Sequence, residues 1–344
     1  MGKSLHCVGE SAEGAAMSKI VIVDTDFEDN SFERELADAA GVELVCCQGR
    51  EPDQVIVNAA DADGIVTSYA KFPRRVFEAL PQLKVVSRTG VGFDTIDLEA
   101  ATEHGVAVCT APGYGTEVVS DHAITLALCV LRRINEIDAD MRNGLWNYKV
   151  HRPLGQVHGR TFGVVGMGEI GRAVARKAAG LGFHVICSSR SLKPGRRTPE
   201  GYDVFELDGL LAAADVVSFH CALTPETHHL LDARRIALMK PDAVVVNTSR
   251  GAVVDTDAMA EALCEGRLWG AGLDVFEGEP VDFQSAICKA PHTVLTSHAA
   301  YWSEESGREL RTRSMQSAID VVLGRRPADC LNPCVFSDAA LPVR

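Results

Sequence analysis

The sequence predicts an α/β protein built from two doubly wound parallel sheets. Short apolar runs rich in Val and Ile alternate with helical patterns along most of the chain, and the alternation starts afresh at Thr161. Strands that alternate with helices form parallel sheets covered by helices on both faces. A chain of 344 residues, 46% of them hydrophobic, is long enough to bury two such cores.

The first series of elements begins at Lys19. Apolar runs predict strands at 19–24, 42–46, 64–67, 84–87 and 106–109, and helical periodicity predicts helices at 31–40, 73–80 and 98–103. Residues 1–16 are small and polar without periodicity, which predicts a disordered leader.

The second series begins with a strand at 161–165 and a helix at 170–179. Further strands are expected at 184–188, 216–220, 243–247, 270–275 and 293–296. Long helical stretches at 116–142 and 303–323 flank this series, and the second could return the chain to the first sheet. We therefore expect a discontinuous first domain, residues 17–115 plus 302–344, with residues 116–301 inserted as a second domain. A ligand cleft would lie where the carboxyl ends of the two sheets face each other.

A glycine-rich turn joins the first strand and helix of the second series. Gly166 allows the tight turn, Gly168 leaves the backbone open to a pyrophosphate, and Gly171 lets the helix pack against the strand. The motif alone is weak, and a turn without a ligand is the alternative. Because strand, turn and helix occur in the right order, we expect a dinucleotide site that includes Glu169 and Ile170.

The composition excludes several classes of protein. A formal net charge of −13 and a pI near 5.3 argue against a nucleic-acid or anionic-membrane surface. There is neither an apolar run of the ~20 residues that span a bilayer nor a signal sequence, so we expect a cytoplasmic protein. The eleven cysteines are scattered without zinc-site spacing. We expect most of them to be small buried side chains in a reducing compartment, and we expect no metal site.

Three segments of the second series place reactive side chains at or beyond the carboxyl ends of strands. Arg250 follows the strand at 243–247, Asp274 and Glu279 lie at and after the strand at 270–275, and His298 follows the last strand. Doubly wound sheets keep their sites at this edge. Each residue alone is more often structural, but together and in this order they indicate a catalytic site.

The chain resembles the D-isomer-specific 2-hydroxyacid dehydrogenases over about residues 19–335. In addition to the segments above, the resemblance rests on Arg-Thr-Gly-Val-Gly-Phe-Asp-Thr-Ile-Asp (88–97) and Gly-Thr-Glu-Val-Val-Ser-Asp-His-Ala (115–123). Residues 223–229 and 298–303 are most similar to the branch that contains the C-terminal-binding proteins. The family implies a Rossmann-type NAD(P)-binding domain inserted into a flavodoxin-like substrate domain, and a homodimer formed through the nucleotide domain.

The resemblance implies roles for the reactive side chains in reducing a small 2-oxo acid. Arg250 would bind the substrate carboxylate and polarise its ketone. His298 would give a proton to the carbonyl oxygen while the nicotinamide delivers hydride, and Glu279 would hold the imidazole in its charged form. Both Arg250 and His298 would therefore contact the substrate as well as act in catalysis.

Further contacts are implied in the same way. Asp274 would bind the nicotinamide carboxamide, and Thr248, Ser249 and Ala300 would contact the cofactor. Backbone N–H groups around Tyr69-Ala70 and Val91-Gly92 would clamp the substrate carboxylate, and Arg88 would either bind substrate or pair with a neighbouring acid. We expect structural roles for His104, His122, His151, His158 and His292, and packing roles for Trp146 and Trp269. For Tyr301 and Trp302 a cleft wall and core packing are equally plausible.

Two positions depart from the family pattern. NAD-specific members carry an Asp at the end of the second strand, where this chain has Ser189 followed by Arg190, with Lys193, Arg196 and Arg197 close behind. Guanidinium groups without the acid would suit a 2′-phosphate, so NADP(H) is favoured over NAD(H). The alternative is a solvated basic loop. Ser297 stands where the family has a Pro before the catalytic His.

The sequence therefore predicts a dimeric NAD(P)-dependent 2-oxo acid reductase that acts on glyoxylate, hydroxypyruvate or a related acid. The alternative is a cofactor-sensing scaffold like the C-terminal-binding proteins, because such proteins use the same fold to recruit partners.

Overall fold

The computed structural model describes residues 17–336, so the expected leader at 1–16 lies outside the described residues. The chain forms two compact units. Of the described residues, the first unit contains 17–112 and 310–336, and the second contains Gly113–Glu309. Among the described residues, no helix combines the length and apolarity needed to cross a membrane. One unit is thus inserted into the sequence of the other.

The first unit contains a five-stranded parallel sheet with the strand order β2-β1-β3-β4-β5. This is the flavodoxin-like order, which confirms the predicted fold class. Its elements are β1 (Lys19–Ile22), α1 (Ser31–Ala40), β2 (Glu43–Cys46), α2 (Pro52–Asn58), β3 (Gly64–Thr67), α3 (Arg74–Ala79), β4 (Val85–Arg88), α4 (Leu98–Glu103) and β5 (Ala107–Cys109), and the 3-10 turn η4 (Pro333–Val335) follows later. The later part of α11 (Glu304–Val322) also belongs to this unit.

Both faces of the first sheet are buried, as the apolar strands predict. Val21 and Ile65 pack on one face with α2, α3 and α4, whereas Ile20 and Ile22 pack on the other with α1 and α11. Alternate residues of β1 therefore serve two separate cores, which explains why its apolar run is uninterrupted.

The second unit contains a seven-stranded parallel sheet with the order β12-β11-β10-β9-β6-β7-β8. Counted from β6, the order 3-2-1-4-5-6 is that of a Rossmann fold, with β12 added at the edge. Its elements are α5 (Thr116–Arg132), α6 (Ile134–Arg142), η1 (Tyr148–His151), β6 (Thr161–Val165), α7 (Glu169–Gly180), β7 (His184–Ser188), β8 (Asp203–Val204), α8 (Leu207–Ala213), β9 (Val216–Phe219), α9 (Ala233–Ile236), β10 (Val244–Asn247), η2 (Gly251–Val253), α10 (Thr256–Cys264), β11 (Gly270–Leu273), η3 (Ile287–Lys289) and β12 (Thr293–Leu295).

Helices cover both faces of this second sheet. α5 and α7 pack on one face around Phe162 and Val246, and α8, α9 and α10 pack on the other around Phe219 and Val245. The strand order reverses between β6 and β9, which pair with each other in parallel. In doubly wound sheets, ligands bind beyond the carboxyl ends of the strands at such a reversal.

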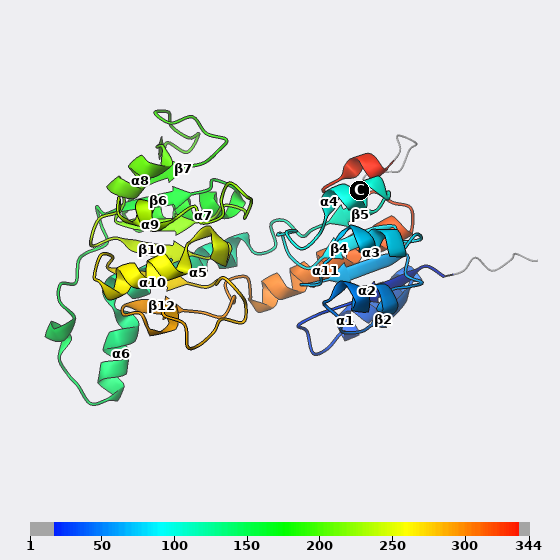
Figure 1. Ribbon diagram of the computed structural model, residues 1–344, viewed down its shortest axis with the longest axis horizontal. Coiled ribbons are helices and arrows are strands. Elements are labelled where there is room, and N and C mark those ends of the chain that lie inside the picture. The colour runs from blue at the N-terminus through cyan, green and yellow to red at the C-terminus, as the bar shows by residue number, and fades with distance from the viewer. Residues whose placement is uncertain (1–16, 337–344) are drawn as a thin grey trace, which may run out of the picture. The chain divides into compact units, whose positions relative to one another are not determined.

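The stretch 116–142, predicted as one continuous helical pattern, is divided at Arg133. This residue has a positive φ of 50°, which ends α5 before α6 begins in a new direction. No residue of α6 is buried, and Figure 1 shows α6 lying away from the sheet of its own unit. The packing role predicted for Trp146 is wrong, because this side chain is 86% exposed. The segment 134–151 therefore forms an exposed arm.

Candidate active site

The three glycines of the β6–α7 turn have different surroundings. Gly166 has a φ of +95°, and a Cβ there would lie 2.7 Å from the His220 carbonyl group in the chain after β9. A Cβ on Gly171 would lie 1.9 Å from the carbonyl oxygen of Gly166, so α7 packs directly on the turn. A Cβ on Gly168 would meet nothing within 4 Å. The turn is thus closed on its protein side and open over Gly168.

The residues around this turn fit a dinucleotide. The open backbone at Gly168 precedes the N-terminus of α7, whose unpaired N–H groups suit a pyrophosphate. Thr248, after β10, has a buried hydroxyl oxygen without a hydrogen-bond partner. A buried polar group of this kind is expected where a bound ligand supplies the partner. Glu169 is directed to the Thr116 hydroxyl at 3.4 Å, and Ile170 packs against the core of this unit.

The rim after β7 carries the basic residues that the sequence singled out. Ser189 directly follows the strand, and its hydroxyl lies 3.3 Å from that of Ser191. Arg190 is exposed, and its charge helps to hold the pKa of Glu226 below its ordinary value, after hydrogen bonds from Thr224 and the backbone. Arg197 forms a 2.7 Å ion pair with Asp203 and is therefore already neutralised.

His298 and Glu279 form a direct pair beyond β12 and β11. The Nδ1 atom of His298 lies 2.6 Å from Oε2 of Glu279, and the other carboxylate oxygen accepts the Phe276 N–H at 3.0 Å. Burial opposes ionisation of Glu279, but the hydrogen bond and charge of His298 outweigh it and lower the pKa of this carboxyl. Because Nδ1 is engaged, Nε2 is the nitrogen that can face a reacting group.

Arg250 lies in the turn after β10, close enough to Glu279 for its charge to help lower the pKa of that carboxyl. Asn247, a buried residue that the sequence analysis did not single out, shapes the turn. Its amide donates to the Arg250 carbonyl at 2.8 Å, and its oxygen accepts from both the N–H and the hydroxyl of Ser249. A polar side chain at the end of a Val-rich strand is the signal that could have revealed it.

Asp274 is buried at the end of β11 and organises the segment that carries His298. Its carboxylate accepts the Thr296 hydroxyl at 2.5 Å and the N–H groups of Ala299 and Ala300 at 2.9 Å. His122, expected to be purely structural, reaches the same group, with Nε2 3.0 Å from the Thr296 hydroxyl and 3.5 Å from Asp274. The contacts expected of Asp274 and Ala300 with a cofactor would therefore be additional to these bonds.

The N–H groups of Tyr69 and Ala70, in the first predicted clamp segment, already have acceptors within the protein. In the first unit, the Tyr69 N–H donates to the buried carboxylate of Asp24 at 2.8 Å, and the Ala70 N–H donates to the Thr67 hydroxyl at 3.3 Å. A substrate clamp formed by backbone N–H groups around these residues therefore stays a prediction. Asp24 had no assigned role, although an acid directly after an apolar strand was visible in the sequence.

The second predicted clamp segment lies after β4 in the same unit. Val91 is 46% exposed and Gly92 follows it, so this loop is open to solvent. The Arg88 guanidinium folds over Gly90, where a Cβ would lie only 1.4 Å from Nη1. Val91 and Gly92 thus stay candidates for binding a substrate carboxylate.

Other aromatic and histidine side chains around the catalytic group have defined positions. Tyr301 packs edge to face against His298, with ring centroids 6.1 Å apart, and Trp302 is 43% exposed. His220, after β9, was not considered as a site residue; its Nε2 lies 2.8 Å from the Ser218 hydroxyl, and burial lowers its pKa to about 3. His104 contacts the Ala100 carbonyl within α4.

The other predicted structural residues lie away from the His298–Glu279 pair. His151 and His292 bind acids of α6, and Trp269 stacks on His292. The ring of His158 lies against Gly182.

Comparisons with known proteins agree with this geometry. The sequence model of the D-isomer specific 2-hydroxyacid dehydrogenase NAD binding domain matches residues 124–300. Glyoxylate reductase from Thermococcus litoralis is 37% identical over 286 residues, which cover 81% of this chain and 86% of that protein.

Two solved structures with bound nucleotides share the fold. An acyclic imino acid reductase in complex with NADPH and D-arginine has a TM-score of 0.82 at 25% identity, covering 91% of this chain and 99% of that one. D-lactate dehydrogenase from Aquifex aeolicus, complexed with NAD and lactic acid, has a TM-score of 0.81 at 28% identity, covering 89% and 96%.

The fold and the matches thus define a pyridine-nucleotide-binding oxidoreductase. Within that class, the chain belongs to the D-isomer specific 2-hydroxyacid dehydrogenase family. The closer resemblance to the C-terminal-binding proteins stays a prediction.

Proposed function

We propose that the protein reduces a small 2-oxo acid such as glyoxylate or hydroxypyruvate with a nicotinamide cofactor. The observation that carries the proposal is the grouping of Arg250, Glu279 and His298 beyond three adjacent strands, with His298 fixed through Nδ1 by Glu279. Relatives named glyoxylate reductase support this substrate class.

The side chains divide the chemistry between them. A bound nicotinamide supplies the hydride that reduces the carbonyl carbon. Arg250 binds the carboxylate and carbonyl oxygen of the substrate and draws electron density toward that oxygen. His298 donates the proton from Nε2 as the oxygen becomes a hydroxyl, and Glu279 stabilises the imidazolium before the transfer. In the oxidative direction, His298 removes the same proton.

The direct test measures the initial rate of NADPH and NADH oxidation with glyoxylate, hydroxypyruvate, pyruvate and longer apolar 2-oxo acids. We expect rapid turnover with one of them and a fall in kcat of about 10²–10⁴-fold in His298→Ala, the usual contribution of a general acid. A matched control is His184→Ala, which removes an exposed histidine from β7. Tight nucleotide binding with negligible turnover across the panel would contradict the proposal and favour the cofactor-sensing scaffold.

For the cofactor, we propose a preference for NADPH. Support comes from Ser189, which offers no carboxylate to repel a 2′-phosphate, and from the exposed guanidinium of Arg190 beside it. Arg190→Asp should shift the ratio of kcat/KM values toward NADH by at least tenfold. Arg197→Ala is the matched control, because Arg197 is paired with Asp203 and its loss should leave the ratio unchanged. An unchanged ratio in Arg190→Asp would show that the basic loop is only solvated.

We further propose that the protein is a homodimer formed through the arm 134–151. α6 buries none of its residues, and the arm exposes large apolar side chains: Ile134, Met141, Leu145, Trp146, Tyr148 and Val150. Large apolar side chains exposed together on one segment suit burial against a second copy of the chain. Trp146→Asp should convert the dimer to a monomer in light scattering, whereas Phe283→Asp, at another exposed aromatic residue, should not. A monomeric wild-type protein would refute this proposal.

The described cysteines are free thiols, which supports our proposal of a reducing, cytoplasmic location.

A further inference from the structure

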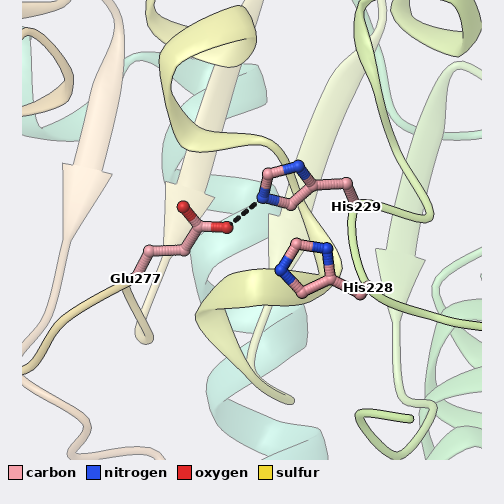
Figure 2. A group of neighbouring side chains, drawn as sticks. All are labelled: His228, His229 and Glu277. Carbon is pink, nitrogen blue, oxygen red and sulfur yellow. Dashed lines mark hydrogen bonds and ion pairs between the residues drawn. The ribbon is translucent and has the colours of Figure 1, made fainter. Parts of the chain in front are cut away.

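Three side chains with nitrogen or carboxylate donors meet at the surface of the second unit, apart from the trio proposed for catalysis. Figure 2 shows the rings of His228 and His229 one beside the other, with Glu277 directed at them. The rings are stacked with centroids 4.1 Å apart, and the Nε2 atom of His229 contacts Oε1 of Glu277. One donor atom from each residue can be chosen so that all three lie within 4.8 Å of one another.

The fold holds two of these donors through the main chain. The His229 N–H donates to the Ala252 carbonyl at 2.7 Å, and the backbone of His229 takes a positive φ of 47°. The segment that carries Glu277 packs tightly against η2, the turn that contains Gly251 and Ala252. A Cβ on Gly251 would lie 1.9 Å from the Phe276 carbonyl carbon. The two loops that supply the donors are therefore fixed relative to each other before any ligand arrives.

A carboxylate also faces the far side of the His229 ring. Oδ2 of Asp255 lies 3.9 Å from Nδ1, while Oδ1 of the same residue caps α10 through the Ala258 N–H. An acid on this side favours a proton on Nδ1 and leaves the Nε2 lone pair for a ligand. Metal-binding histidines commonly have an outer carboxylate in this position.

We propose that His228, His229 and Glu277 form a binding site for a divalent transition metal ion of the Zn²⁺ type. Two imidazoles and one carboxylate are a donor set that zinc accepts, with a fourth position left to water. The ion would take the place of the direct contact between Nε2 of His229 and Oε1 of Glu277. It would also give the exposed His228 ring, which only stacks in the metal-free state, a bond of its own. The sequence predicted no metal because its cysteines and histidines lack zinc-site spacing. That criterion does not detect ligands far apart in the sequence, such as His229 and Glu277, which are 48 residues apart.

The site has a structural consequence for the neighbouring loop. Glu277 lies two residues before Glu279, and His229 is bonded to the turn that follows Arg250. A metal ion here would fasten the chain after β11 to the chain between β9 and α9. We therefore expect Zn²⁺ to raise the melting temperature of the protein and to slow amide exchange in residues 276–279, whatever the protein's substrate.

The experiment titrates the purified, chelator-treated full chain with Zn²⁺ in competition with a chromophoric chelator, without nucleotide or substrate. We expect one ion per chain with a Kd in the micromolar range or below. His228→Ala and Glu277→Gln should each weaken binding at least tenfold and abolish the rise in melting temperature. His229→Asn adds a third ligand variant that tolerates the positive φ. Circular dichroism confirms that each variant is folded.

Two controls separate this site from other histidines. His184→Ala removes another exposed histidine and should leave the Kd unchanged. His298→Ala should also bind the ion normally, so a failed reductase assay would not affect the result. Equal affinity in the wild type, His228→Ala and Glu277→Gln would overturn the proposal, as would a Zn²⁺ affinity in the wild type too weak to compete with the chelator.

Discussion

Asp24 in the first unit and Asp274 in the second each hold a loop in place with the same kinds of hydrogen bonds. Each is a buried carboxylate just beyond a strand, and each accepts a threonine hydroxyl at 2.5 Å. Asp24 also accepts the N–H groups of Ser68 and Tyr69, whereas Asp274 accepts those of Ala299 and Ala300. In both units the acid thereby fixes the loop that follows the neighbouring strand.

The difference lies in what the two loops present. The loop held by Asp274 places His298 at a φ of 53°, with its ring bonded to Glu279. The loop held by Asp24 presents Tyr69, whose ring lies under the guanidinium of Arg50. The same anchoring device therefore supports a proposed proton donor in one unit and mainly a stable loop in the other.

The strongest test of this comparison replaces each acid by its amide. In Asp274→Asn, the new NH₂ group would face backbone N–H donors, so at least one of them loses its acceptor and the loop moves. We expect kcat to fall about 100-fold, the scale of a 1 Å misplacement of a catalytic group. Asp24→Asn should change kcat by less than about threefold.

Thermal unfolding supplies the control for this pair. Each amide variant should lose about 1–3 kcal/mol of stability, the cost of an unsatisfied buried donor, because both acids are anchored alike. Equal losses of kcat in the two variants would show that the loops do not differ in function.

A smaller effect on kcat is expected when only the hydroxyl partner of each acid is removed. Thr67→Val and Thr296→Val keep the shape of the side chain but take one donor from each acid. Hydrogen bonds to charged groups contribute about 1.5–3 kcal/mol, so each variant should be destabilised by about 2 kcal/mol in denaturant unfolding. Only Thr296→Val should also lower kcat, since its hydroxyl contacts both Asp274 and His122.

The smallest expected effect is a pH dependence of stability in the second unit, which contains His220. His220 has a pKa of about 3 when folded, whereas the unfolded chain binds the proton near pH 6.5. Between these values the unfolded state holds more protons, so stability falls as the pH falls. From pH 7.5 to 5.5 this group should cost about 1.4 kcal/mol.

The measurement is convenient because Trp146, Trp269 and Trp302 all belong to the second unit. Tryptophan fluorescence during urea unfolding therefore reports on the unit that contains His220. His220→Gln cannot titrate and should lose this part of the pH dependence. If the variant and the wild type weaken equally on acidification, the proton taken up on unfolding goes elsewhere.

Much of the fold was predictable because strand periodicity and the glycine turn act locally. Strands such as 64–67 and 184–188 were predicted with the bounds that the structure has. Helices such as α2 and α10 escaped prediction, because they are short, with seven and nine residues, and helices of this length depend on packing against the rest of the protein. The break between α5 and α6 depends on the positive φ of Arg133, and an arginine in the sequence does not predict a positive φ.

The candidate site shows the same division. Residues such as Arg250 and His298 could be predicted from their positions after strands, since parallel sheets keep reactive groups at that edge. The occupied N–H of Tyr69 could not, because its acceptor comes from β1 and only folding brings the two together. The pairing of Glu277 with His228 and His229 was hidden for the same reason.

The three glycines of the β6–α7 turn are required for different reasons. Gly166 and Gly171 are each required by neighbouring protein atoms, whereas the space over Gly168 is open. A descendant that lost its nucleotide would therefore have to keep the first and third glycines to stay folded, but it could change the second freely. In a comparison of homologous sequences, the outer glycines trace inheritance of the architecture, and the middle glycine records whether a ligand is still used.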